Sequence, residues 1–318
     1  MMICLLALLF AGCGSHSSSP GVPTVGFADA FEDNTIEQAK QGFIDALKKN
    51  GFDEDKNTVK IIYRNAQGNS PVLTQIIKYF VSEHVDLIAT NPSLATITAI
   101  QNTKDIPVFM MVSPTPDLMK VSDPSLGDPK NLFGVADKQD YIDTSFALIS
   151  SLVKPLSGQL TVGMIYNQAE PQSVEALKRI QALATTLHYT LVSLPVNSTA
   201  DVQLVTASLL NRHIDAFFAN PDNTVFGSFE TIIAACNKAN VPVFTSEAGL
   251  VSRGAVAAYG ADIYQWGYQA GEQAAVFLKT KSTAGLHWDL VKVRKRVYNP
   301  EAAKRFNLNI PAGFEPVH

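Results

Sequence analysis

Two kinds of periodicity alternate along the chain from residue 24 onward. Short runs rich in β-branched and aromatic residues, such as "TVGFAD" and "VKIIYRNA", alternate with stretches whose apolar residues recur at helical spacing. In the first helical stretch Ile36, Ala39 and Phe43 share one face, and Asn50-Gly51 supplies a stop signal. Strands that alternate with helices of this length predict βαβ units and a parallel sheet.

One strand-and-turn pattern is written twice. "VDLIATNPS" (residues 85–93) and "IDAFFANPD" (residues 214–222) each give an acid, an apolar run, Asn-Pro and a polar residue. The matching "PVF" triplets at residues 107–109 and 242–244 extend the repeat. The sequence therefore predicts an α/β protein with two Rossmann-like lobes, each built on a parallel sheet.

The length of 318 residues suits two cores better than one. The second lobe's pattern is complete by Ser246, yet strand- and helix-forming segments continue, so we expect the chain to cross between the lobes more than once. The expected crossings lie near residues 136–140, 247–253 and 281–288. These crossings predict an N-terminal lobe of residues 24–136 plus 252–282 and a C-terminal lobe of residues 137–251 plus 283–318. Such a multi-crossover hinge between two sheets makes a closing cleft.

The two repeated turns end in different side chains, a hydroxyl at Ser93 and a carboxylate at Asp222. Ligands of open parallel sheets bind beyond the carboxyl ends of the strands, where both turns lie. Ser93 falls at a helix N-terminus, which favours an anion, and Asp222 places a carboxylate at the equivalent point of the other lobe. A ligand with one carboxylate and one ammonium group, as in a free α-amino acid, matches this pair. In the alternative interpretation both residues only cap their own helices.

Other strand-end loops are expected to face the same cleft. Ser113 is predicted to join Ser93 in holding the ligand carboxylate, and Glu170 or Glu247 is the alternative to Asp222 for the ammonium group. The predicted ligand-binding residues are Phe31, Ser93, Ser113, Asn167, Glu170, Asp222, Asn223 and Glu247. Trp266 and Trp288 are expected to lie away from these loops, which counts against a sugar, since sugar sites favour stacking aromatics.

Several classes of function lack support in the sequence. No G-x-S-x-G, G-x-x-x-x-G-K-[ST] or G-x-G-x-x-G motif is present, and the six histidines are scattered without metal-ligand spacing. We therefore expect no catalysis, no cofactor and no metal. The net charge of −4 argues against nucleic acid as a partner.

The first 23 residues are expected to lie outside the fold. Residues 1–12 give an apolar run too short to span a bilayer, followed by small residues, which indicates a signal peptide. Cys13 comes next, and "LFAGC" resembles a bacterial lipobox, whose cysteine is acylated. Residues 13–23 then form a lipid-anchored linker rich in serine, glycine and proline. The alternative is an ordinary signal peptide with an incidental cysteine.

Several longer stretches resemble a known family. They are "RNAQGN" (64–69), "IPVFMMVSP" (106–114), "GMIYNQAEPQS" (163–173), "NPDNTV" (220–225) and "YNPEAAKRFNLNIP" (298–311). In these stretches the chain resembles the lipoprotein group of ABC-transporter substrate-binding proteins that includes tryptophan- and tyrosine-binding members, with the type I periplasmic-binding-protein fold. The resemblance implies a non-catalytic, extracytoplasmic binding protein that delivers cargo to an ABC permease and its ATPase. Departures from the group's pattern at Phe31, at 91–93 and at 113–114 leave the ligand's identity open.

The sequence therefore predicts a monomeric, lipid-anchored solute-binding protein of the cell envelope, with an amino acid, aromatic or large and apolar, as its ligand. Three alternatives stay open at this point. The same fold serves sugars and nucleosides, it serves sensing modules that report to a receptor without transport, and a two-lobe scaffold can carry an enzyme.

Overall fold

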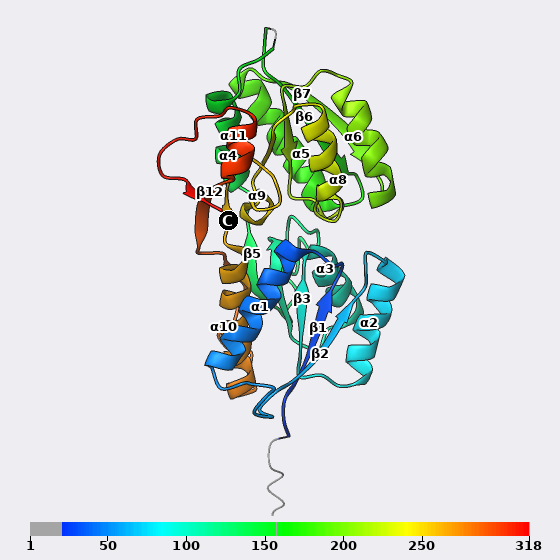
Figure 1. Ribbon diagram of the computed structural model, residues 1–318. Coiled ribbons are helices and arrows are strands. Elements are labelled where there is room, and N and C mark those ends of the chain that lie inside the picture. The colour runs from blue at the N-terminus through cyan, green and yellow to red at the C-terminus, as the bar shows by residue number, and fades with distance from the viewer. Residues whose placement is uncertain (1–20, 157, 318) are drawn as a thin grey trace, which may run out of the picture.

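The computed structural model describes residues 21–156 and 158–317 and shows two α/β lobes, one above the other in Figure 1. The predicted signal peptide and Cys13 lie outside the described residues. Among the helices of the described ranges, none has both the length and the apolar composition needed to cross a membrane.

The N-terminal lobe is built on a six-stranded sheet in the order β11-β5-β4-β3-β1-β2. All of its neighbouring strands run parallel, as the alternation of strands and helices predicts. The strands are β1 (Thr24–Asp29), β2 (Lys60–Asn65), β3 (Leu87–Asn91), β4 (Val108–Pro114), β5 (Leu132–Asp137) and β11 (Asp289–Leu290). Helices α2 (Ser70–Ser82) and α3 (Ser93–Asn102) cover one face, and α1 (Asn34–Lys49) and α10 (Ile263–Thr280) cover the other.

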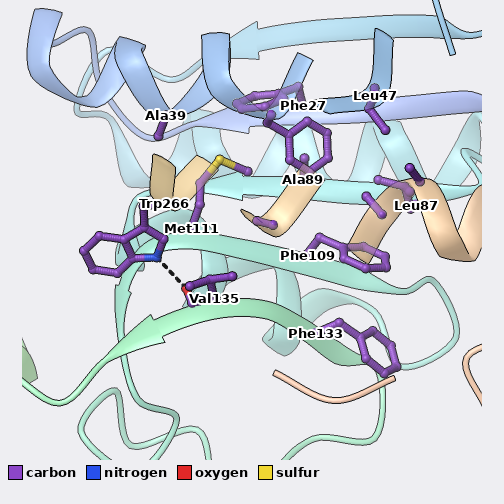
Figure 2. Packing of buried hydrophobic residues seen from close by; sticks show 14 of the residues in the cluster. Phe27, Ala39, Leu47, Leu87, Ala89, Phe109, Met111, Phe133, Val135 and Trp266 are labelled. Carbon is purple, nitrogen blue, oxygen red and sulfur yellow. Dashed lines mark hydrogen bonds between the residues drawn. The ribbon is translucent and has the colours of Figure 1, made fainter. Parts of the chain in front are cut away.

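The core beneath α1 and α10 is aromatic and tightly packed. Phe27 and Phe109 of the sheet lie in this cluster, which Figure 2 shows with the Trp266 indole N–H donating to the Val135 carbonyl at 2.8 Å. The two helices touch backbone to backbone, because a Cβ added at Gly267 would lie 1.8 Å from the Ala39 carbonyl oxygen. Only glycine fits there, so α10 is fixed in the N-terminal lobe although it follows most of the C-terminal lobe in sequence.

The C-terminal lobe has a four-stranded parallel sheet in the order β7-β6-β8-β9 and a three-stranded sheet in the order β10-β12-β13. The strands are β6 (Thr161–Asn167), β7 (Thr190–Val196), β8 (Ala216–Ala219), β9 (Val243–Thr245), β10 (Ala257–Ala261), β12 (Arg294–Tyr298) and β13 (Glu315–Pro316). The helical segments are α4 (Tyr141–Leu152), α5 (Pro171–Leu187), η1 (Thr199–Asp201), α6 (Val202–Leu210), α7 (Asn223–Phe226), α8 (Phe229–Lys238), α9 (Ala248–Val251) and α11 (Pro300–Arg305).

The chain passes between the lobes after β5, between β10 and α10, and between β11 and β12 (Figure 1). The later two crossings differ from the boundaries that the sequence predicted. Residues 255–261 lie with the C-terminal lobe, because β10 pairs antiparallel with β12 and the Val256 N–H donates to the carbonyl of Val243, the first residue of β9. Residues 289–290 lie with the N-terminal lobe, because β11 extends its sheet beside β5.

Candidate functional site

The two repeated turns meet across a cavity between the lobes. The Asn223 side-chain amide of the C-terminal lobe donates to the Ser93 hydroxyl of the N-terminal lobe at 3.3 Å, so the cleft is closed. The cavity is partly open to solvent and small in this closed form: the centre of a water molecule can occupy about 30 Å³ of it. Five of the predicted ligand-binding residues line it, namely Ser93, Ser113, Asp222, Asn223 and Glu247.

Ser93 is the first residue of α3, and it leaves the start of that helix open. The preceding Pro92 supplies no side-chain cap, and its carbonyl accepts from the N–H groups of Ala95 and Thr96. In the described part of the chain, the N–H groups of Ser93 and Leu94 have no hydrogen-bond acceptor. Free N–H groups at the positive end of a ten-residue helix are suited to an anion.

Ser113 lines the cavity at a distortion of β4. Val112 has a φ of 48°, rare for a β-branched residue, and the pairing with β5 shifts register between Met110 and Ser113. The Ser113 hydroxyl contacts the Thr96 hydroxyl at 3.1 Å and donates to the Met111 carbonyl at 3.1 Å. Because its proton is already used, Ser113 is better placed to shape the cavity than to donate to a ligand carboxylate.

Asp222 is buried, and its carboxylate serves the fold. One oxygen caps α7 by accepting from the Val225 N–H at 2.9 Å. The other accepts from the Asn167 N–H at 2.7 Å and from the Ser173 hydroxyl. Burial raises the pKa of Asp222, and these donors oppose the rise. Asp222 reaches the cavity wall, but its two oxygens are already bonded to three groups of the protein.

Glu170 and Asn167 stand behind the wall and are not among the lining residues. Glu170 accepts from the Asn223 N–H at 2.9 Å and from the Thr224 hydroxyl at 3.1 Å, and the Asn167 amide donates to the same hydroxyl at 2.8 Å. Burial, followed by the nearby Asp222 charge, raises the pKa of Glu170 to about 8. These side chains form a hydrogen-bonded cluster that holds the loops after β6 and β8 together.

Glu247 follows β9 and is also buried, but its carboxylate accepts fewer hydrogen bonds than those of Asp222 and Glu170. The Tyr141 hydroxyl donates to its Oε1 at 2.6 Å, whereas the neighbouring Ser246 hydroxyl makes no hydrogen bond. Its Oε2 has no such partner among the residues that the structure describes. Burial, together with the nearby Asp137 charge, raises the pKa of Glu247 to about 7, although the Tyr141 hydrogen bond and the Arg294 charge act in the opposite direction. Of the three lining carboxylates, this one best fits a cationic ligand group.

The third lining carboxylate belongs to Asp137, at the first crossing between the lobes. Asp137 forms an ion pair of 2.9 Å with Arg294, which stands at the start of β12 beside the third crossing. The Arg294 guanidinium also lies over the Tyr141 ring, 4.8 Å from its centroid. Arg294 therefore offsets the charge of Asp137 and positions the tyrosine that binds Glu247.

Two aromatic rings contribute apolar surface to the cavity lining. Phe226 and Trp266 line the cavity, so the expectation that Trp266 lies away from the strand-end loops is wrong. It reaches the cavity because α10 begins directly after the second crossing. Phe31 is not among the lining residues and instead packs against the apolar clusters of both lobes.

The prediction from the sequence missed several lining residues, among them Asp137, Tyr141, Trp266 and Val112. Asp137 ends a strand, just as Asp222 follows one, so the strand-end rule could have identified it. Tyr141 begins the next helix at the same crossing. The inward position of Trp266 depends on the crossing that was misplaced, and the bulge at Val112 has no recognisable sequence signal.

Similar proteins share both the fold and the sequence pattern. The tyrosine-binding protein of Clostridioides difficile (strain R20291) is 29% identical over 315 residues, covering 94% of this chain and 88% of that protein. The crystal structure of a conserved domain protein from Vibrio cholerae O1 biovar El Tor has a TM-score of 0.82 at 29% identity, covering 92% of this chain and 96% of that one.

Two further similar structures differ in whether a ligand is bound. A Streptococcus pneumoniae ABC domain in complex with L-Trp has a TM-score of 0.82 at 23% identity, covering 91% of this chain and 96% of that one. The ligand-free, open structure of a substrate binding protein from Clostridium difficile has a TM-score of 0.67 at 25% identity, covering 93% of this chain and 99% of that one.

The sequence model of one family, described as ABC transporter substrate binding protein, matches residues 24–313, almost all of the described chain. With the two-lobe fold and the cavity between the lobes, this match gives the identity that the sequence pattern predicted: the chain belongs to the family of ABC-transporter substrate-binding proteins.

Proposed function

We propose that the cleft binds an α-amino acid with an aromatic side chain and delivers it to an ABC permease. The observation that carries the proposal is the pairing, across one cavity, of a free helix N-terminus at Ser93 with a partly unpaired carboxylate at Glu247. These two groups are complementary to the carboxylate and the ammonium group of one small zwitterion.

The charge of the lining supports a ligand with a single ammonium group. Its acidic side chains are Asp137, Asp222 and Glu247, with no lysine or arginine among the described lining residues. Arg294 offsets Asp137, and Asp222 is bonded to protein donors. Glu247 therefore takes the ammonium group in this proposal, in place of Asp222, which the sequence had favoured.

The side chain of the ligand would lie against Phe226 and Trp266. Rings that pack on rings gain about 0.5–1.5 kcal/mol beyond their buried area. The similar tyrosine-binding protein supports this choice of ligand class. Phe31 would act indirectly, by packing between the lobes when they close.

The proposal extends to the N-terminus. Residues 1–12 would direct export and Cys13 would carry a lipid anchor, so that the described lobes stand outside the membrane on the linker of residues 13–23. Closure around the amino acid would present a closed form to the permease.

A thermal-shift screen tests the ligand class. Free L-amino acids, common sugars and nucleosides are each added to the protein, and the melting temperature is followed. A ligand at 100 times its dissociation constant adds about 2.7 kcal/mol of stability. We expect shifts with tyrosine, tryptophan or phenylalanine. Shifts with sugars or nucleosides alone would contradict the proposal and assign Trp266 to stacking on those ligands.

A further inference from the structure

Arg253 lies just after α9 and is fixed within its own lobe by contacts to three residues. Its guanidinium donates to Glu230 at 2.8 and 2.9 Å and to the Phe226 carbonyl at 3.1 Å, and it lies 5.4 Å from the centroid of the Phe229 ring. The side chain is only 13% exposed. These contacts hold one guanidinium nitrogen, Nη1, toward the N-terminal lobe.

That nitrogen forms an ion pair with Asp33 across the cleft and lies 3.3 Å from the Thr35 hydroxyl. The Asp33 side chain is 1% exposed. Its other oxygen caps α1 by accepting from the N–H groups of Thr35 and Ile36 at 2.8 and 3.0 Å. One carboxylate therefore starts a helix of the first lobe and binds the second lobe at the same time.

Close packing surrounds this ion pair. A Cβ added at Gly249 would lie 1.9 Å from the Thr35 methyl group, so α9 sits directly on the start of α1 (Figure 1). Ile36 is buried in the apolar cluster of the C-terminal lobe, beside Leu250. These contacts join the two lobes in the closed cleft.

We propose that Arg253 is a positioning residue for ligand binding, whose ion pair with Asp33 latches the cleft shut and steadies the Phe226 segment of the cavity wall. Arg253 does not line the cavity. Its effect on affinity follows from linkage: a contact present only in the closed form raises the closed fraction, and apparent affinity scales with that fraction. Because the ligand leaves through the open form, the latch also slows dissociation.

The substitution Asp33→Asn isolates the latch from the helix cap. Asparagine caps a helix about as well as aspartate, so α1 keeps its start while the charge that binds Arg253 is lost. A charge-assisted hydrogen bond of this kind corresponds to about tenfold in an equilibrium constant. We expect the dissociation constant for L-tyrosine to rise about tenfold, mostly through faster dissociation, with the association rate nearly unchanged.

Asp143→Asn is the matched control. Asp143 also forms an ion pair with an arginine, Arg179, but both residues lie in the C-terminal lobe, on α4 and α5. This variant should bind as the unchanged protein does. Small-angle X-ray scattering of the three ligand-free proteins gives a second readout, with a larger radius of gyration expected for Asp33→Asn alone.

The outcomes separate the latch from the ligand assignment on which the affinity test rests. An Asp33→Asn protein with unchanged affinity and dissociation rate overturns the latch and leaves the proposed function standing. If no amino acid binds the unchanged protein but Asp33→Asn is more open, the ligand class is wrong and the latch is supported. If no amino acid binds and the three radii agree, both proposals fail.

Discussion

The two Asn-Pro turns occupy equivalent places in the two lobes, but they use their helix starts in opposite ways. After Pro221, Asp222 caps its own helix and ties it to β6. After Pro92, the Ser93 hydroxyl accepts from the opposite lobe, and the N–H groups of Ser93 and Leu94 have no acceptor in the described part of the chain. A single side chain thus decides whether a helix start stabilises the fold or remains available to a ligand.

The comparison also explains why the cationic end of the ligand is assigned to a different strand. Since Asp222 is bonded within the fold and Asp137 is paired with Arg294, the lining carboxylate that remains for the ligand is Glu247, just after β9. Helix α7 has four residues and α3 has ten, so the larger helix dipole lies on the side proposed for the ligand carboxylate.

Ser93→Asp should have the largest effect on ligand affinity, because it places a carboxylate at the start of α3, as Asp222 does at the start of α7. The new carboxylate would occupy the helix start and repel the ligand carboxylate. Two like charges about 4 Å apart cost about 4 kcal/mol at an effective dielectric constant of about 20. We expect amino-acid binding to weaken about 1,000-fold by isothermal titration calorimetry.

Ser93→Asn is the neutral control, since it has similar size and also caps a helix. It should weaken binding far less than Ser93→Asp. Equal losses in the two variants would mean that the site is limited by space and not by charge, and the anion assignment at α3 would be wrong.

Glu247→Gln should weaken binding about 100-fold, within the ~2–5 kcal/mol that removal of one partner of a buried charge pair costs. The pH dependence sharpens the assignment. The pKa of Glu247 is about 7, and an ammonium ligand needs the ionised carboxylate, so affinity should fall as pH drops below 7. The variant should lose this dependence. An unchanged pH profile in Glu247→Gln would move the ammonium group elsewhere.

The sequence predicted the features that short stretches determine. Alternating periodicity gave the parallel sheets, and the strand-end rule placed Ser93, Ser113 and Glu247 on the cavity. Both inferences depend on local pattern, because a parallel strand and the turn after it are encoded by neighbouring residues.

Features that depend on distant partners were not predictable in the same way. The carboxylate of Asp222 is occupied because β6 and α5, some 50 positions earlier, bring the Asn167 N–H and the Ser173 hydroxyl to it. The strand "AAYGA" of β10 does not reveal whether it will join the first sheet or pair with β12. That long-range choice misplaced the second crossing, and with it Trp266.

Asp222→Ser tests the structural half of the comparison. Serine keeps the helix cap but cannot also accept from Asn167 and Ser173, which would be left unpaired in a buried site. We expect unfolding free energy to fall by about 2 kcal/mol, measured by denaturant titration. As a control, Asp201→Ser alters an exposed capping box and should cost less than about 1 kcal/mol. Unchanged stability in Asp222→Ser, together with lost binding, would return Asp222 to the ligand.

The smallest expected effect concerns Glu170, which shares its buried surroundings with Asp222. Its folded pKa of about 8 lies above the ordinary 4.5, so between these values the folded protein holds a proton that the unfolded chain releases. The contribution of Glu170 to the free energy of unfolding is therefore largest below pH 4.5 and is lost as the pH rises through 8. From pH 6 to pH 7 the loss is about 1 kcal/mol. Glu170→Gln should remove this part of the slope in denaturant titrations at the two pH values. A variant as pH-sensitive as the unchanged protein would show that Glu170 is already ionised, and that the cluster behind the cavity wall holds two negative charges at neutral pH.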